Sequence, residues 1–369
     1  MTKQPSYRFA GYTEPWEQRK LGECTEISAG GDIEKSKLLN NGKYPVIANA
    51  LTNDGIVGYY NDSYRIEAPA VTVTGRGDVG VAKARNVNFT PVVRLLSLKS
   101  EHDVIFLENA INTQKIVIES TGVPQLTAPQ LGRYNIFFPS LPEQTAIGSF
   151  FQDIDQLISL QQRKLEVLKE QKKTYLKLLF PAKGQTKPAL RFAGFEDDWK
   201  EVKLGDFVEI SKGIQRNKEF LSPNADNKNC YPVYNGGKQE SGYTDESNRE
   251  GNIMISEGGA SAGFVNYFDG KYWSGGHNFT IDELENNIHY VLALLESQQQ
   301  ELYSLQVGSG LPNIQLNSLK KVIIAFPDFQ EQEAIGSFFQ DLDKAIAKQE
   351  EKVKNLKESK QTLLRKMFI

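Results

Sequence analysis

The chain contains one stretch of sequence twice, almost unchanged. Residues 143–156 read EQTAIGSFFQDIDQ, and residues 331–344 read EQEAIGSFFQDLDK, 188 positions later. A short apolar motif can recur by chance, but agreement over this length indicates the duplication of a structural unit. The fold of this chain must therefore place the same local structure twice.

The repeat extends to both ends of each half. Residues 8–30, which begin RFAGYTEPW, match residues 191–213, which begin RFAGFEDDW, at an offset of 183. Residues 122–139 match residues 310–327 at an offset of 188. The chain is therefore a unit of about 180 residues written twice. The change of offset places five extra residues in the middle of the second copy, where the two copies agree least.

This division into a shared frame and a divergent middle has a functional interpretation. The shared segments would hold the same partner twice, whereas the middles would bind different targets. The alternative is a duplication whose interiors have simply drifted apart.

Composition bounds the class of protein. A length of 369 residues suggests two or three domains, and the hydrophobic content of 39% is ordinary for a soluble globular protein. No run approaches the roughly 18 apolar residues of a membrane helix, and the first residues do not resemble a secretory signal. Cys24 and Cys230 lie outside any C-x-x-C spacing. We therefore expect a cytoplasmic protein with reduced thiols, no metal site and no membrane partner.

The charge distribution leaves room for a local basic face. The net charge of −3 argues against nucleic-acid binding by bulk electrostatics alone. Residues 76–99, however, contain a single acid, Asp78. Exposed cations are usually only solvated, so this segment is a candidate basic strip and no more. Its cations are Arg76, Lys83, Arg85, Arg94 and Lys99.

The middles of both halves read mainly as strands and turns. Residues 65–84 and 251–281 are β-branched and aromatic runs interrupted by Gly, Asn and Asp. Residues 287–305 favour a helix. Each half therefore begins with an α+β globule of about 140 residues.

A heptad repeat follows each globule. Apolar residues alternate steps of four and three along both copies, which predicts a long helix with a coiled-coil seam. Its polar interruptions, Gln161 and Lys172, recur at Gln349 and Lys360. The apolar seam consists of Ile147, Phe151, Ile154, Ile158, Leu165 and Leu168 in the first copy, and of Ile335, Phe339, Leu342, Ile346, Val353 and Leu356 in the second.

Each of these helices needs a partner helix. About 35 residues form a rod of roughly 50 Å, and a seam of that length is not buried alone. A pseudo-twofold relation between the halves would pair the two helices antiparallel, whereas a coiled coil between separate chains is the competing arrangement. The expected fold is α+β, with two pseudo-symmetric globular domains joined by two long antiparallel coiled-coil helices.

Motifs for catalysis or cofactor binding are weak. GRGDVG at residues 75–80 fits G-x-G-x-x-G, but a dinucleotide site needs a helix next, and residues 81–96 read as strand. The sequence has no G-x-x-x-x-G-K-[ST] motif for ATP and no [ND]-P-P-[YF] methyltransferase motif. A nuclease-like order of acids after Pro327 is not matched in the first copy. His102, His277 and His289 are scattered. We expect no catalytic residue in this chain.

Two variable globules, each opened by RFAG…W…KLG and followed by a long helix introduced by P-x-x-x-E-Q, resemble the specificity subunit of type I restriction-modification systems. The resemblance covers essentially the whole chain. It implies that each globule is a target recognition domain for one half of a split double-stranded DNA site, with the helices as spacer. It also implies docking of two methyltransferase subunits, which recruit motor-nuclease subunits. The sites for S-adenosylmethionine, ATP and magnesium would then lie on those partners.

The resemblance suggests domain boundaries, while two other function classes remain open. One is a coiled-coil scaffold that binds only protein, and the other is a self-contained enzyme. The expected domains are a first target recognition domain at 1–141, a first spacer helix at 142–181, a linker at 182–190, a second target recognition domain at 191–327 and a second spacer helix at 328–369.

Candidate DNA contacts follow from side-chain chemistry, because the family has no fixed base-contact motif. Arg and Lys suit guanine, and Asn and Gln suit adenine, in the major groove. Some candidates would contact phosphates instead of bases. In the first domain the candidates are Asn49, Asn53, Arg76, Lys83 and Arg85; in the second they are Lys212, Gln215, Arg216, Lys238, Gln239, His277 and Asn278.

Overall fold

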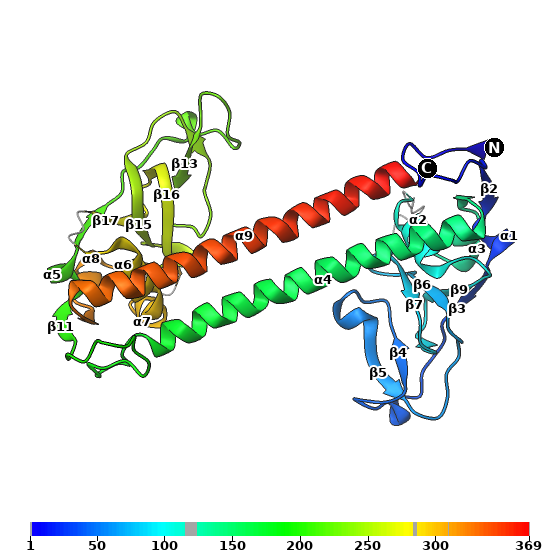
Figure 1. Cartoon of the computed structure of the whole chain (residues 1–369), viewed down its shortest axis with the longest axis horizontal. Helices are drawn as coiled ribbons and strands as arrows, with labels where there is room; N and C mark the ends of the chain where they lie inside the picture. Colours follow the sequence, from blue (N-terminus) through cyan, green and yellow to red (C-terminus); the bar gives the residue numbers. More distant parts are fainter. Residues whose placement is uncertain (1, 115–123, 283–285, 309, 369) are drawn as a thin grey trace. The chain divides into compact units, whose positions relative to one another are not determined.

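A computed structural model describes residues 2–114, 124–282, 286–308 and 310–368. The chain forms two compact units (Figure 1). The first unit comprises residues 1–162 and 351–369, and the second comprises residues 163–350. Each unit therefore contains one globule together with parts of both long helices. The predicted domain boundaries, which divide the chain into consecutive segments, stay predictions.

The first unit is built on a four-stranded antiparallel sheet with the order β3-β9-β6-β7. A second sheet has the order β5-β4-β8, in which β4 and β8 run parallel, and a third has the order β1-β2-β10. The strands are β1 (Thr2–Lys3), β2 (Trp16–Lys20), β3 (Glu26–Ala29), β4 (Tyr44–Ile47), β5 (Ile56–Tyr60), β6 (Ala70–Thr74), β7 (Ala82–Arg85), β8 (Thr90–Pro91), β9 (Leu95–Lys99) and β10 (Asn135–Phe138).

The second unit repeats this topology in a single six-stranded sheet, β12-β17-β15-β16-β13-β14, beside the two-stranded sheet β11-β18. The long strand β16 pairs with β15 on one side and runs parallel to β13 on the other, as β7 and β8 do separately in the first unit. The divergent middles therefore share one architecture. The strands are β11 (Lys200–Lys203), β12 (Glu209–Lys212), β13 (Tyr231–Tyr234), β14 (Tyr243–Thr244), β15 (Arg249–Ser256), β16 (Val265–Ser274), β17 (Asn278–Asp282) and β18 (Ile323–Phe326).

Short helices pack against these sheets, and side-chain caps begin several of them. The Asp103 carboxylate accepts from the backbone N–H groups of Ile105 and Phe106 at the start of α2, and Asn287 caps α6 in the same way. The predicted helix at 287–305 divides at Gln298 into α6 and α7. The helices are α1 (Leu21–Cys24), α2 (Val104–Asn112), α3 (Ala128–Gly132), α5 (Leu204–Phe207), α6 (Ile288–Ser297), α7 (Gln299–Ser304) and α8 (Leu316–Lys320).

The two long helices are α4 (Leu141–Leu178) and α9 (Phe329–Met367). Ion pairs join them within each unit: Asp155 to Lys360 in the first, and Lys172 to Asp343 in the second. Higher numbers in one helix meet lower numbers in the other, so the helices pair antiparallel within one chain. All positions of the predicted seam are buried or half-buried.

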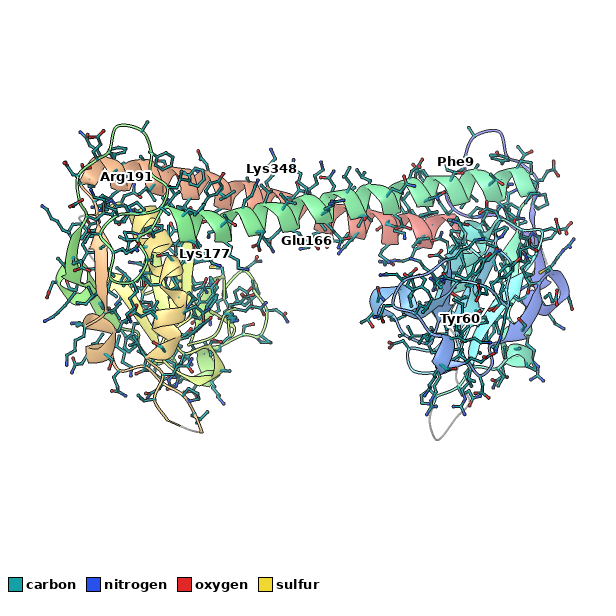
Figure 2. The ribbon with its side chains drawn as sticks, turned by 90° about the horizontal axis from the view of Figure 1, so that it is seen from below. Phe9, Tyr60, Glu166, Lys177, Arg191 and Lys348 are labelled. Atoms are coloured by element: carbon teal, nitrogen blue, oxygen red, sulfur yellow. The ribbon has the colours of Figure 1, made fainter. Side chains whose placement is uncertain are left out.

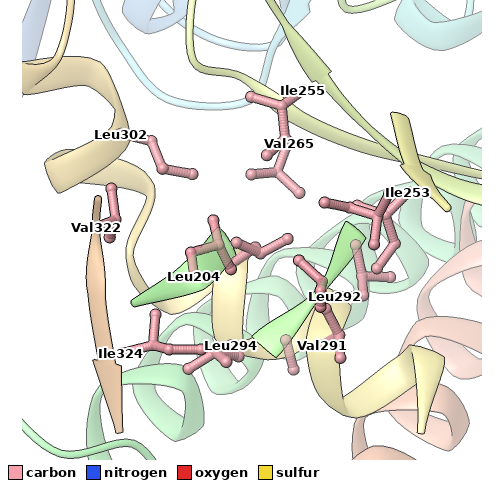
Figure 3. Packing of buried hydrophobic residues seen from close by; sticks show 14 of the residues in the cluster. Leu204, Ile253, Ile255, Val265, Val291, Leu292, Leu294, Leu302, Val322 and Ile324 are labelled. Carbon is pink, nitrogen blue, oxygen red and sulfur yellow. The ribbon is translucent and has the colours of Figure 1, made fainter. Parts of the chain in front are cut away.

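Each unit has one main hydrophobic core, and each core includes the end of the long helix from the other copy. Trp16 and Phe106 lie within the core of the first unit together with Phe368, from the end of α9. In the second unit, Phe180 contacts Trp199 in the same way. Figure 3 shows part of the second core, in which residues from several strands and helices gather.

The repeated EQ pair fixes the start of each long helix. The Arg8 guanidinium donates two hydrogen bonds of 2.7 Å to the buried Glu143 carboxylate, which also accepts from Trp16 Nε1 at 3.3 Å. Arg191, labelled in Figure 2, does the same for Glu331. Because each Arg belongs to the RFAG segment, these bonds explain why RFAG and EQ recur together.

The glycine of the repeat allows the long helix to approach a neighbouring helix cap. A Cβ atom on Gly148 would lie 2.3 Å from Oδ1 of Asp103, the cap of α2. A Cβ atom on Gly336 would lie 2.3 Å from Oδ1 of Asn287, the cap of α6. The shared sequence is therefore a packing joint between the long helix and its globule.

Candidate nucleic-acid interface

Four connections converge at one end of the main sheet in the second unit. They follow β12, β13 and β15 and join β16 to β17. Gly213 N donates to the Asn278 carbonyl at 2.8 Å, and Glu257 N donates to the His277 carbonyl at 2.8 Å. The Asn278 side chain is buried and bonds the backbone N–H of Gly236 and the backbone carbonyl of Tyr234. We call this the second loop cluster.

Several predicted contact residues of the second domain lie in or beside this cluster. The Lys212 ammonium is 2.6 Å from the Glu257 carboxylate. The His277 side chain is 62% exposed, with Nδ1 3.8 Å from the same carboxylate. The Lys238 ammonium lies over the Phe264 ring at 5.1 Å, next in sequence to Gln239. Polar groups that can donate to a ligand are therefore grouped here.

The Arg216 side chain is held by contacts within the second unit. Its guanidinium lies over the Trp273 ring at 4.5 Å, and it pairs with the Asp245 and Glu246 carboxylates. Gln215, its neighbour, donates to the Arg216 backbone carbonyl. The burial of Asn278 and this pairing of Arg216 favour a supporting role for both residues over direct base contact.

The first unit has the equivalent loop cluster. Gly30 N donates to the Leu95 carbonyl at 2.7 Å, matching the Gly213 to Asn278 bond of the second unit. Asn49 ties two loops together, because its Oδ1 accepts from Gly75 N at 2.8 Å and its Nδ2 donates to the Val93 carbonyl at 3.0 Å. We call this the first loop cluster. Arg76, next to Gly75, is exposed within it.

The three other predicted residues of the first domain gather around Asp54 instead. Arg85 is buried and lies 2.6 Å from the Asp54 carboxylate, while Lys83 is exposed at 3.6 Å from it. Burial lowers the pKa of Arg85 from its ordinary value, although Asp54 opposes this. Asn53 has φ +48° and donates to the Ile56 carbonyl, so it forms the turn itself. Arg85 therefore supports the fold, and Lys83 remains accessible.

Two segments of the chain, residues 13–170 and 196–358, match the model of the type I restriction modification DNA specificity domain. The chain belongs to this family of type I specificity subunits. The specificity subunit of the type I restriction enzyme MjaVIII from Methanocaldococcus jannaschii is 21% identical over 403 residues, covering 95% of this chain and 92% of that protein. A Mycoplasma pneumoniae protein described as a type I specificity subunit, S.MpnORF89P, is 31% identical over 44% of this chain. The match spans 51% of that relative's length.

Solved structures from type I restriction-modification systems have the same fold. The S subunit of a type I restriction-modification system from M. genitalium superposes with a TM-score of 0.74 at 19% identity, covering 100% of this chain and 99% of that one. A chain from a structural study of type I complex assembly gives a TM-score of 0.56 at 17% identity, with 98% of both chains covered. The predicted α+β architecture with two long antiparallel helices is confirmed.

In this specificity subunit, the first loop cluster also holds a cation that was not among the predicted contacts. Arg94, predicted only as part of a basic strip, lies immediately before β9. Its φ of +70° is uncommon for a residue with a side chain. His277 holds the equivalent place before β17, where the sequence did identify a candidate. The only sequence signal for Arg94 was its position opposite His277 in the aligned halves.

No cluster of three His, Cys, Asp or Glu residues is arranged to hold a metal ion within the described ranges. None of the helices in those ranges is long and apolar enough to span a membrane.

Proposed function

We propose that this specificity subunit recognises a DNA site in two parts, with each unit reading one half. The observation that carries the proposal is the pair of loop clusters. Both are built on the same backbone hydrogen bonds, such as Gly30 to Leu95 and Gly213 to Asn278, but they carry different side chains. The two clusters share a backbone arrangement but differ in their side chains. Such a pair suits the recognition of two different base sequences, because bases in the major groove are distinguished by their hydrogen-bond donors and acceptors.

The accessible polar residues would supply the hydrogen bonds to the bases. Arg and Lys donate to guanine, and Gln and Asn pair with adenine. Other cations would contact phosphates, and such contacts position the protein on the DNA without carrying sequence information. We propose as direct contacts the exposed candidates outside the Asn53 turn: Arg76, Lys83, Lys212, Gln215, Lys238, Gln239 and His277.

We further propose that the chain is non-catalytic and works through partner subunits. The long helices α4 and α9 would set the spacing between the half-sites, and the repeated segments would dock two methyltransferase subunits. S-adenosylmethionine would bind those partners, while ATP and magnesium would serve motor-nuclease subunits in the complex. A net charge of −3 supports this division, because partners would then supply much of the positive surface that clamps the duplex.

The test is co-expression of this chain with its methyltransferase subunit, followed by mapping of methylated adenines across a genome. We expect one motif made of two specific half-sites separated by unspecified bases. A continuous motif, or no methylation, would contradict split-site reading and favour a protein-only scaffold. Replacing residues 22–141 with the corresponding domain of another family member should change one half-site and leave the other intact.

A further inference from the structure

A β-turn in the first loop cluster places Arg94 at its tip. Leu95 N donates to the Val92 carbonyl at 3.0 Å, which closes the turn with Arg94 as its third residue. The φ of +70° at Arg94 belongs to the left-handed region, which favours glycine at this position of a type II turn. A side chain here costs about 1 kcal/mol or more of backbone strain. The fold alone therefore gives no reason for an arginine at this position.

The second unit also has a turn in this place, closed by the equivalent hydrogen bond but without a positive φ at its third residue. Asn278 N donates to the Gly275 carbonyl at 3.0 Å, so His277 is the third residue of the turn. The glycines that precede both clusters confirm the equivalence. A Cβ atom on Gly30 would lie 2.1 Å from the Val92 carbonyl oxygen, and one on Gly213 would lie 2.1 Å from that of Gly275. Both units thus present a nitrogen-bearing side chain from one architectural position.

Arg94 is half-buried in the first loop cluster. Within the described residues its guanidinium has no hydrogen bond or ion pair, unlike those of Arg85 and Arg216. Its backbone packs closely against Gly75, where a Cβ atom would lie 2.2 Å from the Arg94 carbonyl oxygen. The turn therefore holds an unengaged guanidinium on a closely packed backbone.

We propose that Arg94 reads a guanine in the half-site of the first unit, donating two hydrogen bonds to its O6 and N7 atoms. This inference rests on the proposed function. Arginine is suited to this contact because its planar fork matches the two acceptors, and such a pair discriminates against other bases. The left-handed backbone is retained because it projects the side chain from the tip of the turn.

The test compares Arg94→Gly with the parent chain, each co-expressed with the methyltransferase subunit. We expect guanine preference at one position of one half-site to fall by about tenfold or more, with the other half-site unchanged. Arg94→Gly should also raise the melting temperature of the specificity subunit, because glycine relieves the strained φ. Arg133→Ala, at an exposed site outside the cluster, removes the same charge and should leave the motif intact. His277→Ala should affect only the other half-site.

Three outcomes would overturn the assignment while leaving the proposed function in place. They are an unchanged motif in Arg94→Gly, a uniform loss of methylation with the motif preserved, which would identify a phosphate contact, and a lower melting temperature. A parent complex that methylates no two-part motif would overturn the proposed function itself, and the assignment with it.

Discussion

Arg8 and Glu143 form a buried ion pair across 135 residues of sequence, with two N–O distances of 2.7 Å. Arg191 and Glu331 repeat it in the second unit. Each pair connects the segment before β2 or β11 to the beginning of a long helix. The direction in which the helix leaves its globule is therefore fixed by a two-point contact between planar groups, which constrains orientation as well as distance.

Replacing Glu143 with alanine should destabilise the first unit by about 3 kcal/mol, because it leaves the Arg8 guanidinium buried without its carboxylate. Trp16 Nε1 loses its acceptor in the same change. Hydrogen exchange read separately over the two units would measure the effect. Glu17→Ala, which breaks the exposed pair with Arg19, is the matched control and should change stability by less than about 0.5 kcal/mol. Equal exchange in Glu143→Ala and parent would show that the pair is not required.

Gly148→Ala should also destabilise the first unit, although alanine is the better helix former by about 1 kcal/mol. The new Cβ atom would displace the Asp103 carboxylate, whose capping of α2 contributes about 1 kcal/mol or more. Gly336→Ala should cost more, because the backbone nitrogen of Tyr290 also lies 2.9 Å from the new atom. Gly310→Ala meets nothing within 4 Å and should be neutral. Denaturant unfolding of the four proteins would measure this order, and a stabilised Gly148→Ala would contradict it.

The long helices could be predicted from the sequence because a heptad seam is a local pattern. The partner of each helix could not be predicted, since the same seam fits an antiparallel pair within one chain or a coiled coil between chains. The ion pair of Lys172 with Asp343 decides for the first, and it recurs, shifted by 188, as Lys360 with Asp155. The sequence showed the two lysines only as interruptions of the seam, because their acidic partners lie on the other helix.

The loop clusters were harder to predict than the helices. Asn49, Arg85 and Asn278 have the side chains of base readers, yet each is committed to hydrogen bonds within its own unit. Composition cannot distinguish a polar residue that ties loops together from one that faces a ligand. Arg94 was not among the predicted contacts for the converse reason, because its distinction is a backbone angle set by the turn and not by the surrounding residue types.

Phe368→Ala should destabilise the first unit by about 3 kcal/mol, although Phe368 belongs to the second copy of the repeat. Its ring lies 5.3 Å from that of Phe106 and 5.9 Å from that of Phe151. Phe180→Ala should act on the second unit in the same way, through Tyr290 at 5.7 Å. Hydrogen exchange of the individual units would show where each loss falls. Phe329→Ala, at a half-exposed ring, should change little. If each substitution lowered stability only in the unit that its own copy of the repeat forms, the packing of each helix end into the other copy's core would be refuted.

Glu108 on α2 and Glu296 on α6 are both half-buried carboxylates, but their surroundings differ. Glu296 lies 2.7 Å from the Lys172 ammonium. Glu108 instead accepts a hydrogen bond from Ala84 N at 2.8 Å, and burial raises its pKa, although that bond and the nearby charges of Lys83 and Lys360 oppose the shift. The folded first unit therefore binds this proton more tightly than the unfolded chain does.

A raised carboxyl pKa means that the folded unit loses stability as pH rises from the ordinary Glu value through the raised one. Glu108→Gln removes this loss, so the variant should be more stable than the parent at pH 7, and the difference should vanish near pH 4, at the ordinary pKa of about 4.3. Burial raises the pKa of Glu296 as well, although Lys172 opposes the shift, so Glu296→Gln should also gain stability relative to the parent as pH rises. Unfolding of both variants and the parent between pH 4 and about 8 would measure both dependences. A Glu108→Gln protein less stable than the parent at pH 7 would show that the ionised carboxylate is favourable where it lies.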